Sequence, residues 1–313
     1  AQQRLAFEEL LAHGLSLRRQ RIALRDHGAH PLPPAQAAVD ALRSTLPFAL
    51  TGAQQRVLAE VECDLADGAP MLRLVQGDVG SGKTVVAALA AMQAVAAGRQ
   101  VALMAPTELL AEQHLQNFQR WFEPQGVRVC WLAGKVTGKA RREALAAIAD
   151  GSAQVVVGTH ALMQGGVAFA KLGLVIVDEQ HRFGVHQRLA LRDKGLEGER
   201  VPHQLVMTAT PIPRTLAMTA YADLDLSVID ELPPGRTPVT TVAVAAERRP
   251  ELVERVRKAC AEGRQAYWVC PLIEESEEIE AQAAQTTFEQ LSEALPELRV
   301  ALLHGRMKPA EKA

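Results

Sequence analysis

Residues 77–84 read Gly-Asp-Val-Gly-Ser-Gly-Lys-Thr and match the phosphate-binding pattern G-x-x-x-x-G-K-[ST]. Glycines let successive backbone N–H groups turn toward one phosphate, and a helix that begins there adds the positive end of its dipole. An incidental glycine-rich turn is disfavoured, because an apolar run precedes the pattern and an alanine-rich run follows it. We therefore predict a nucleoside triphosphate site formed by Gly77, Asp78, Val79, Gly80, Ser81, Gly82, Lys83 and Thr84. Lys83 would neutralise the β- and γ-phosphates, and the Thr84 hydroxyl would bind Mg²⁺.

Two carboxylates, Asp178 and Glu179, follow the apolar run 174–177. In proteins with a phosphate-binding loop, a carboxylate at the end of a buried strand binds the metal ion. We predict that Asp178 holds Mg²⁺ and that Glu179 orients or deprotonates the attacking water. A lone Asp-Glu pair is about as often a plain acidic loop, but the phosphate-binding loop upstream favours the catalytic interpretation.

Two nucleotide-binding motifs that the chain lacks narrow the choice of nucleotide. Asn117 is the only asparagine and is followed by Phe118, so the guanine-reading sequence N-K-x-D of GTPases is absent. A dinucleotide fingerprint also fails, because Val85 stands where its third glycine belongs. ATP is then the expected nucleotide, with Gln54 as a candidate for hydrogen bonds to the adenine edge. Taken alone, Gln54 could equally be a residue on a helix surface.

Short β-rich runs separated mostly by Ala/Leu-rich windows predict βαβ units and a parallel sheet. The runs are residues 71–76, 100–105, 127–132, 154–158, 172–177 and 204–208. Both chemical motifs come directly after such runs. Ligands of parallel α/β sheets bind at the carboxyl ends of the strands, so the predicted sheet brings the two motifs to one edge.

Prolines divide the chain into segments. Pro31, Pro33 and Pro34 end a leucine- and arginine-rich helical pattern in residues 1–25, and residues 231–238 are rich in proline. Beyond this linker, we expect strands at 239–244, 265–270 and 298–304 and helices at 250–262 and 277–295. The expected domains are residues 1–46 as connecting helices, 47–232 as a nucleotide-binding domain, and 233–313 as a linker with the start of a second domain.

The composition is typical of a globular protein. Hydrophobic residues make up 48% of the 313 residues and charged residues 22%, which excludes a disordered chain or a disulfide-stapled miniprotein. The four cysteines form no C-x-x-C pair, so we expect reduced thiols and a cytoplasmic location. The longest nearly apolar run, residues 85–97, is too short to span a bilayer, and no membrane partner is expected. Because 34 Lys and Arg oppose 36 Asp and Glu, any nucleic acid must be held by local basic groups.

Several segments resemble the motifs of superfamily 2 helicases. Residues 178–185, Asp-Glu-Gln-His-Arg-Phe-Gly-Val, resemble motif II in the form found in the RecG family. Residues 105–114, 158–160, 207–216 and 304–307 resemble motifs Ia, Ic, III and IV, and residues 225–239 resemble the RecG inter-domain connection. The transcription-repair coupling translocases share two of these stretches but usually have Glu where Gln180 stands. Gln180 and the linker therefore favour the RecG family, with the coupling translocases as the alternative.

The resemblance implies an α/β fold with a RecA-like P-loop NTPase domain built on a parallel sheet, followed by the N-terminal part of a second RecA-like domain. It also implies an ATP-hydrolysing double-stranded DNA translocase and helicase that remodels stalled replication forks and Holliday junctions in recombination and repair. The implied cofactors are ATP and Mg²⁺, the partner is branched double-stranded DNA, and we expect a monomer. Gln180 and His181 would join the catalytic residues.

The resemblance further implies which residues contact the DNA backbone or couple it to the nucleotide. They are Thr107, Glu108, Gly134, Thr159, His160, Thr208, Thr210, Arg214, His304 and Arg306. For Thr159 or His160 alone, a local helix cap is the competing interpretation. Aromatic residues make up only 4% of the chain and fall in apolar patterns, so tracking of a duplex backbone fits better than base stacking.

The chain reads as an excised piece that stops soon after the segment resembling motif IV. The arginine that family members extend toward the transferring phosphate would then be missing. We expect the 313-residue chain to bind ATP and Mg²⁺ but to hydrolyse ATP poorly. A hypothesis from a different class is an ATP-gated DNA-binding module without motor activity.

Overall fold

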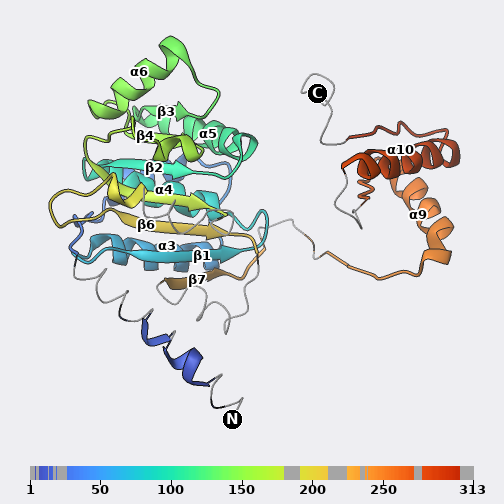
Figure 1. Cartoon of the computed structure of the whole chain (residues 1–313), viewed down its shortest axis with the longest axis horizontal. Helices are drawn as coiled ribbons and strands as arrows, with labels where there is room; N and C mark the ends of the chain where they lie inside the picture. Colours follow the sequence, from blue (N-terminus) through green and yellow to red (C-terminus); the bar gives the residue numbers. More distant parts are fainter. Residues whose placement is uncertain are drawn as a thin grey trace. The chain divides into compact units, whose positions relative to one another are not determined.

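The computed structural model in Figure 1 describes residues 27–179, 191–210, 224–232, 237, 239–270 and 277–303, together with residues 4, 7–12, 14–16 and 19. The contacts within the chain divide it into two units, Ala1–Thr237 and Pro238–Ala313. Each unit is described by itself. Residues 7–12 and 14–16 are helical, in the segment for which the sequence predicts a helix.

The first unit is built on a seven-stranded sheet whose order is β3-β4-β2-β5-β6-β1-β7. All six neighbouring pairs run parallel. The strands are β1 (Leu72–Gly77), β2 (Gln100–Met104), β3 (Val129–Leu132), β4 (Val155–Gly158), β5 (Leu172–Asp178), β6 (His203–Thr208) and β7 (Asp225–Ile229). The α/β fold with a parallel sheet, predicted from the alternation of β-rich and helical runs, is confirmed.

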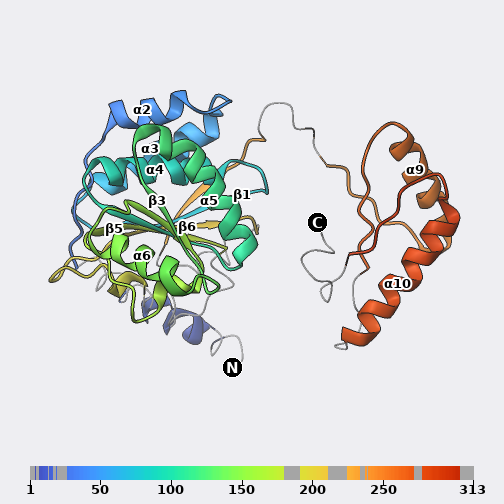
Figure 2. The same cartoon turned by 90° about the horizontal axis from the view of Figure 1, so that it is seen from above.

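Helices cover both faces of this sheet (Figure 2). Along each central strand, successive side chains alternate between two buried clusters: Val101 and Leu103 belong to one, and Ala102 and Met104 to the other. The first cluster contains residues of α2 (Gln36–Ser44), α3 (Gly52–Ala66), α4 (Lys83–Ala96) and α5 (Glu108–Phe122). The second contains residues of α6 (Gly138–Ala149) and of the 3₁₀ turn η2 (His160–Met163). This two-sided burial explains why the strands read as continuous apolar runs. A second 3₁₀ turn, η1 (Glu123–Gln125), follows α5.

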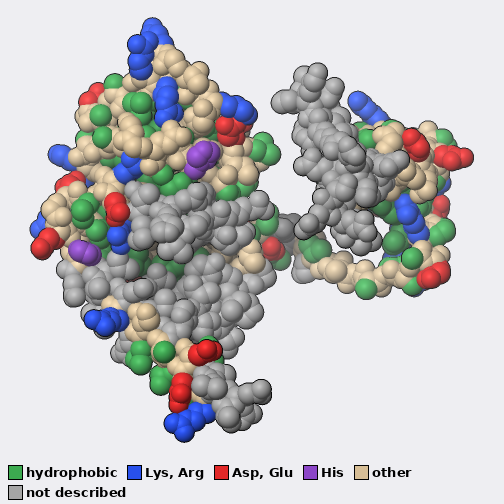
Figure 3. Space-filling view, in the orientation of Figure 1, with side chains coloured by type: hydrophobic (Ala, Val, Ile, Leu, Met, Phe, Trp, Pro, Cys, Tyr) green, Lys and Arg blue, Asp and Glu red, His purple; other side chains and the backbone are tan. Residues whose placement is uncertain are grey.

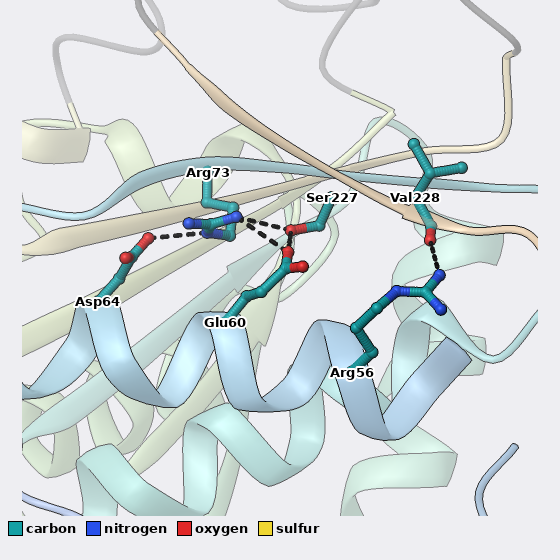
Figure 4. A network of polar contacts seen from close by, with 6 residues as sticks. All are labelled: Arg56, Glu60, Asp64, Arg73, Ser227 and Val228. Atoms are coloured by element: carbon teal, nitrogen blue, oxygen red, sulfur yellow. Dashed lines mark hydrogen bonds and ion pairs between the residues drawn. The ribbon is translucent and has the colours of Figure 1, made fainter. Parts of the chain in front are cut away.

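Strand β7 was not predicted, since residues 225–239 were described only by their resemblance to the RecG inter-domain connection. A polar network attaches this edge strand to the sheet and to α3 (Figure 4). Arg73 of β1 donates to Asp64 (2.7 Å) and to Ser227 of β7 (2.7 Å), and the Ser227 hydroxyl donates to Glu60 of α3. One turn earlier on α3, Arg56 donates to the carbonyl of Val228 (3.2 Å). Polar side-chain contacts therefore join this edge strand to β1 and α3, in addition to its ladder with β1 and the buried Ile229.

His203, the first residue of β6, connects the N-terminal segment to the sheet. Its Nδ1 accepts a hydrogen bond from the Met71 N–H (3.1 Å), and its Nε2 donates to the carbonyl of His30 (2.9 Å). This assignment requires the neutral ring, because a proton on Nδ1 would face the Met71 N–H. Burial accordingly lowers the pKa of His203 below its ordinary value.

We expect the stability of the chain to fall in mild acid because of His203. The unfolded chain protonates this imidazole near its ordinary pKa of about 6.5, whereas the folded chain resists protonation until a lower pH. The contribution is therefore complete above a pH of about 6.5 and is lost as the pH falls from there toward the lower pKa of the folded chain. Urea unfolding at pH 7.5 and 5.5 should show a larger drop in the midpoint for the wild type than for His203→Gln. Equal drops in the two chains would contradict this role.

The second unit contains the 3₁₀ turn η4 (Ala246–Arg248) and the helices α9 (Arg249–Ala261) and α10 (Glu277–Ala294). Both predicted helices are therefore confirmed to within a residue or two. The three predicted strands are wrong over their described residues, since 239–244, 265–270 and 298–303 form no ladder. Apolar side chains there remain exposed, including Tyr267 (86%) and Val269 (78%). A strand exists only with a hydrogen-bonded neighbour, and periodicity alone does not supply one.

Across the described residues of both units, no helix is long and apolar enough to cross a membrane.

Candidate nucleotide-binding site

The predicted functional residues of the first unit follow six neighbouring strands and meet at one edge of the sheet. In the spatial order of the strands, the loops contain Gly134 after β3, Thr159 after β4, Thr107 after β2, Glu179 after β5, Ala209 after β6 and Asp78 after β1. The phosphate-binding loop therefore lies on one side of the Asp178–Glu179 strand. The loops predicted to contact DNA lie on the other side.

The loop 77–84 has the backbone that a phosphate cradle requires. Gly80 and Gly82 have φ values of 78° and 89°, which side chains disfavour. A Cβ on Gly82 would also overlap the amide nitrogen of Gln54. Gly82 is the N-cap of α4 and supplies no side-chain cap, so the positive end of α4 faces the loop.

Lys83 folds back across this loop. Its Nζ donates to the carbonyl oxygens of Gly77 (2.6 Å) and Asp78 (3.0 Å). Burial lowers the pKa of Lys83, while the nearby carboxylates of Asp178 and Glu179 oppose that effect. A half-buried ammonium that donates to neutral carbonyls is well suited to exchange them for a phosphate.

A second observation supports the binding of a nucleoside triphosphate by the loop 77–84. The Ser81 hydroxyl is buried and has no hydrogen-bond partner within the described part of the chain. A buried hydroxyl without a partner is costly, and a phosphate oxygen would satisfy it. Thr84, in the first turn of α4, lies at the partly exposed mouth of the loop, as expected of a metal-binding hydroxyl.

Gln54 is not a residue on the helix surface, because only 3% of it is exposed. Its Oε1 accepts the Thr51 N–H (2.9 Å), and the Thr51 hydroxyl accepts the Gln54 N–H (3.3 Å), which together form a capping box at the start of α3. Its Nε2 donates to the carbonyl of Ser81 (2.8 Å). Gln54 therefore stabilises the backbone of the phosphate-binding loop at Ser81. Its contact with adenine stays a prediction.

Glu179 lies at the end of β5 with a φ of 50°, a conformation that is strained for a residue with a side chain. Its carboxylate accepts hydrogen bonds from the Thr208 hydroxyl (3.1 Å) and from the Ala209 N–H (3.0 Å). Thr208 in turn accepts the Thr210 N–H (3.2 Å). The predicted catalytic carboxylate and the segment resembling motif III are therefore one hydrogen-bonded unit.

Asp178 is only 8% exposed and contacts a residue to which the sequence analysis gave no role. His114 of α5 lies with Nε2 at 2.7 Å from Asp178 Oδ2. The sequence held a signal for it: His114 occupies an otherwise apolar face of α5, with the buried Ala111, Phe118 and Phe122. A polar group on such a face needs a buried partner.

The loops predicted to contact DNA differ in exposure. Thr107 is exposed and caps α5 by accepting the Leu110 N–H (3.3 Å), Glu108 pairs with Lys135, and Gly134 is exposed with open space around it. Thr159 is buried, with a hydroxyl that has no partner among the described residues, whereas His160 is exposed. Basic side chains gather over α6, which follows Gly134 (Figure 3). Backbone N–H groups, hydroxyls and cations of this kind are the usual contacts to nucleic-acid phosphates.

Five predicted site residues lie outside the described residues. They are Gln180, His181, Arg214, His304 and Arg306. Their roles remain as the resemblance implies them.

Residues 51–219 match the model of the DEAD/DEAH box helicase family. The chain is 66% identical, over 313 residues, to the ATP-dependent DNA helicase RecG of Escherichia coli O157:H7, covering 100% of this chain and 45% of the relative. It is 47% identical over 314 residues to RecG of Synechocystis, covering 37% of that protein. The chain thus spans less than half of the length of these relatives.

Solved structures agree with these sequence matches. A RecG bound to a three-way DNA junction superposes with a TM-score of 0.79 at 40% identity, covering 94% of this chain and 38% of that one. The yeast protein Dbp5 bound to RNA and ADP BeF3 shares the fold, with a TM-score of 0.59 at 17% identity. Since the matched family model spans more than half of its residues, the chain belongs to the DEAD/DEAH box helicase family.

Proposed function

We propose that this chain is the ATP-binding part of an ATP-dependent double-stranded DNA translocase and helicase that remodels stalled replication forks and Holliday junctions. The observation that carries the proposal is the order of loops along the sheet edge. The phosphate-binding loop, the two carboxylates and the polar loops after β2, β4 and β3 follow one another along it. We infer branched DNA as the substrate from the RecG relatives, one of which was solved bound to a three-way DNA junction.

In this proposal the nucleotide phosphates lie in the loop 77–84, with Lys83 against the β- and γ-phosphates. Thr84 and Asp178 would hold Mg²⁺, which when bound neutralises charge on the phosphates. Glu179, fixed by Thr208 and Ala209, orients the attacking water and accepts its proton.

The DNA backbone would lie across the loops after β2, β4 and β3. Thr107, Gly134 and His160 are exposed there and can reach sugar and phosphate groups. Thr208 and Thr210 would couple the two halves, because they follow β6 on the nucleotide side and share a hydrogen-bond network with Glu179, whose strand β5 borders β2. The domain organisation into residues 1–46, 47–232 and 233–313 is part of the proposal, as are the monomeric state and the cytoplasmic location.

The proposal predicts that DNA stimulates hydrolysis of ATP by a chain extended to the length of its RecG relatives. The measurement compares steady-state ATPase activity without DNA, with linear duplex and with a forked duplex of equal length. We expect the forked duplex to stimulate most. Binding of ATP without any stimulation by DNA would instead favour an ATP-gated binding module. Equal stimulation by linear and forked duplex would contradict the remodelling of forks.

A further inference from the structure

The carboxylate of Asp178 is held by a buried imidazole from a different element. His114 Nε2 and Asp178 Oδ2 are 2.7 Å apart, and the two side chains are 8% and 12% exposed. The two residues are far apart in sequence, and α5 packs against the same face of the sheet as α4. A charge-assisted hydrogen bond at this distance and degree of burial is among the stronger kinds.

The imidazole is itself fixed by its helix. His114 shares the buried face of α5 with Phe118 and Phe122, whose rings stack at 5.2 Å between centroids. Thr107 caps the first turn of the same helix. A ring anchored in this way can determine where a neighbouring carboxylate lies, since the ring is not free to follow the carboxylate.

The hydrogen-bonding capacity of the pair assigns the proton. An ionised carboxylate only accepts hydrogen bonds, so the proton lies on His114 Nε2 and Oδ2 of Asp178 accepts it. His114 Nδ1 then carries a lone pair, and it is buried without a partner among the residues that the structure describes. The contact with the ring uses Oδ2, and the second oxygen, Oδ1, would be the one to bind a metal ion or a water bound to it.

We propose that His114 is a positioning residue for the metal site: its Nε2–H holds Asp178 in the rotamer that binds Mg²⁺ with the nucleotide. The inference rests on the metal-binding role of Asp178 in the proposed function. Residues that hydrogen-bond a metal ligand typically change metal affinity by about 10- to 100-fold when removed. His114 thereby acts on the metal through Asp178 and does not touch it.

The test measures the affinity of the 313-residue chain for Mn²⁺, with ADP present, from the electron paramagnetic resonance signal of free Mn²⁺. His114→Leu removes the donor and keeps an apolar side chain of similar size, whereas His114→Gln keeps an N–H donor near the position of Nε2. We expect Leu to weaken Mn²⁺ binding by about 10- to 100-fold and Gln to restore most of it. His203→Gln alters another buried histidine, at the opposite end of its strand from the site, and should leave the affinity unchanged.

Two outcomes overturn the role of His114. One is wild-type affinity in a folded His114→Leu chain whose Asp178→Asn counterpart binds Mn²⁺ weakly. The other is an equal loss in the Leu and Gln variants, because packing and not the hydrogen bond would then be responsible. Wild-type affinity in Asp178→Asn overturns instead the metal-binding role of Asp178, so the two failures are distinguishable.

A measurement on the unaltered chain decides the matter if His114→Leu does not fold. Long-range ¹H–¹⁵N correlation spectra of the wild-type histidines should show His114 protonated on Nε2, with ring shifts that change when Mg²⁺ and ADP are added. A His114 ring protonated on Nδ1, or ring shifts that do not respond to the metal, would overturn the proposal.

Discussion

Lys83→Ala is expected to abolish the rise in melting temperature that ATP and Mg²⁺ give to this chain. A ligand at 100 times its Kd stabilises the folded state by about 2.7 kcal/mol. For a domain of this size, that corresponds to a rise of roughly 5 to 10 °C. Lys83 is the cation held over the phosphate-binding loop by the Gly77 and Asp78 carbonyls, so its removal leaves the phosphate charge without a partner. Differential scanning fluorimetry with and without the nucleotide measures the shift.

Lys194→Ala is a matched control for this substitution. Lys194 Nζ also donates to two backbone carbonyls, those of Gln164 and Val167, both at 2.7 Å, and burial likewise lowers its pKa. The control therefore loses the same kind of contact at a place that contains no part of the loop. We expect it to melt at a lower temperature yet to keep the full response to ATP. An unchanged response in Lys83→Ala would show that the nucleotide binds elsewhere.

Glu179→Gln is expected to leave nucleotide binding intact and to lower the rate of ATP hydrolysis by about 10²- to 10⁴-fold in a chain extended to the length of its relatives. The amide oxygen can still accept the Ala209 N–H, and the amide NH₂ can donate to the Thr208 hydroxyl, so the local structure survives. It cannot accept a proton from water. Single-turnover hydrolysis and equilibrium binding of ATP, measured on the same variant, separate the two effects.

The control for this variant is Glu197→Gln. Glu197 is an exposed carboxylate that accepts from Arg99 at 2.7 Å, in a loop without any predicted catalytic residue. Hydrolysis should stay at the wild-type rate there. If Glu179→Gln loses the nucleotide itself, the carboxylate is a structural or metal-binding group and not the base.

The sequence alone was sufficient to predict the parts of the fold that depend on buried strands. The apolar run before Asp178 became β5, and the loop 77–84 became a turn between β1 and α4, because burial on both faces and glycine geometry leave few alternatives. Strand β7 escaped prediction because its attachment depends on Ser227, Glu60 and Arg73, which are distant in sequence and carry no periodic signal.

The candidate site was predictable in its residue types but not in its contacts. Gln54 was a plausible ligand of the nucleotide, yet its hydrogen bond to Ser81 and its place in the capping box depend on how α3 packs beside the loop. His114 lay within a segment that resembles motif Ia, but its partner Asp178 is the last residue of β5, which is distant in sequence. Side-chain pairs of this kind arise from the order of strands in the sheet, which local sequence patterns do not specify.

Locating the metal ion and the nucleotide together tests the proposed nucleotide site most directly. Crystals of this chain grown with a non-hydrolysable ATP analogue and Mn²⁺ would show the metal by its anomalous scattering. We expect one Mn²⁺ peak between the Thr84 hydroxyl and the carboxylate of Asp178, with the β- and γ-phosphates against Lys83. A nucleotide bound away from the loop 77–84, or a metal peak without Asp178 beside it, would contradict the proposed site.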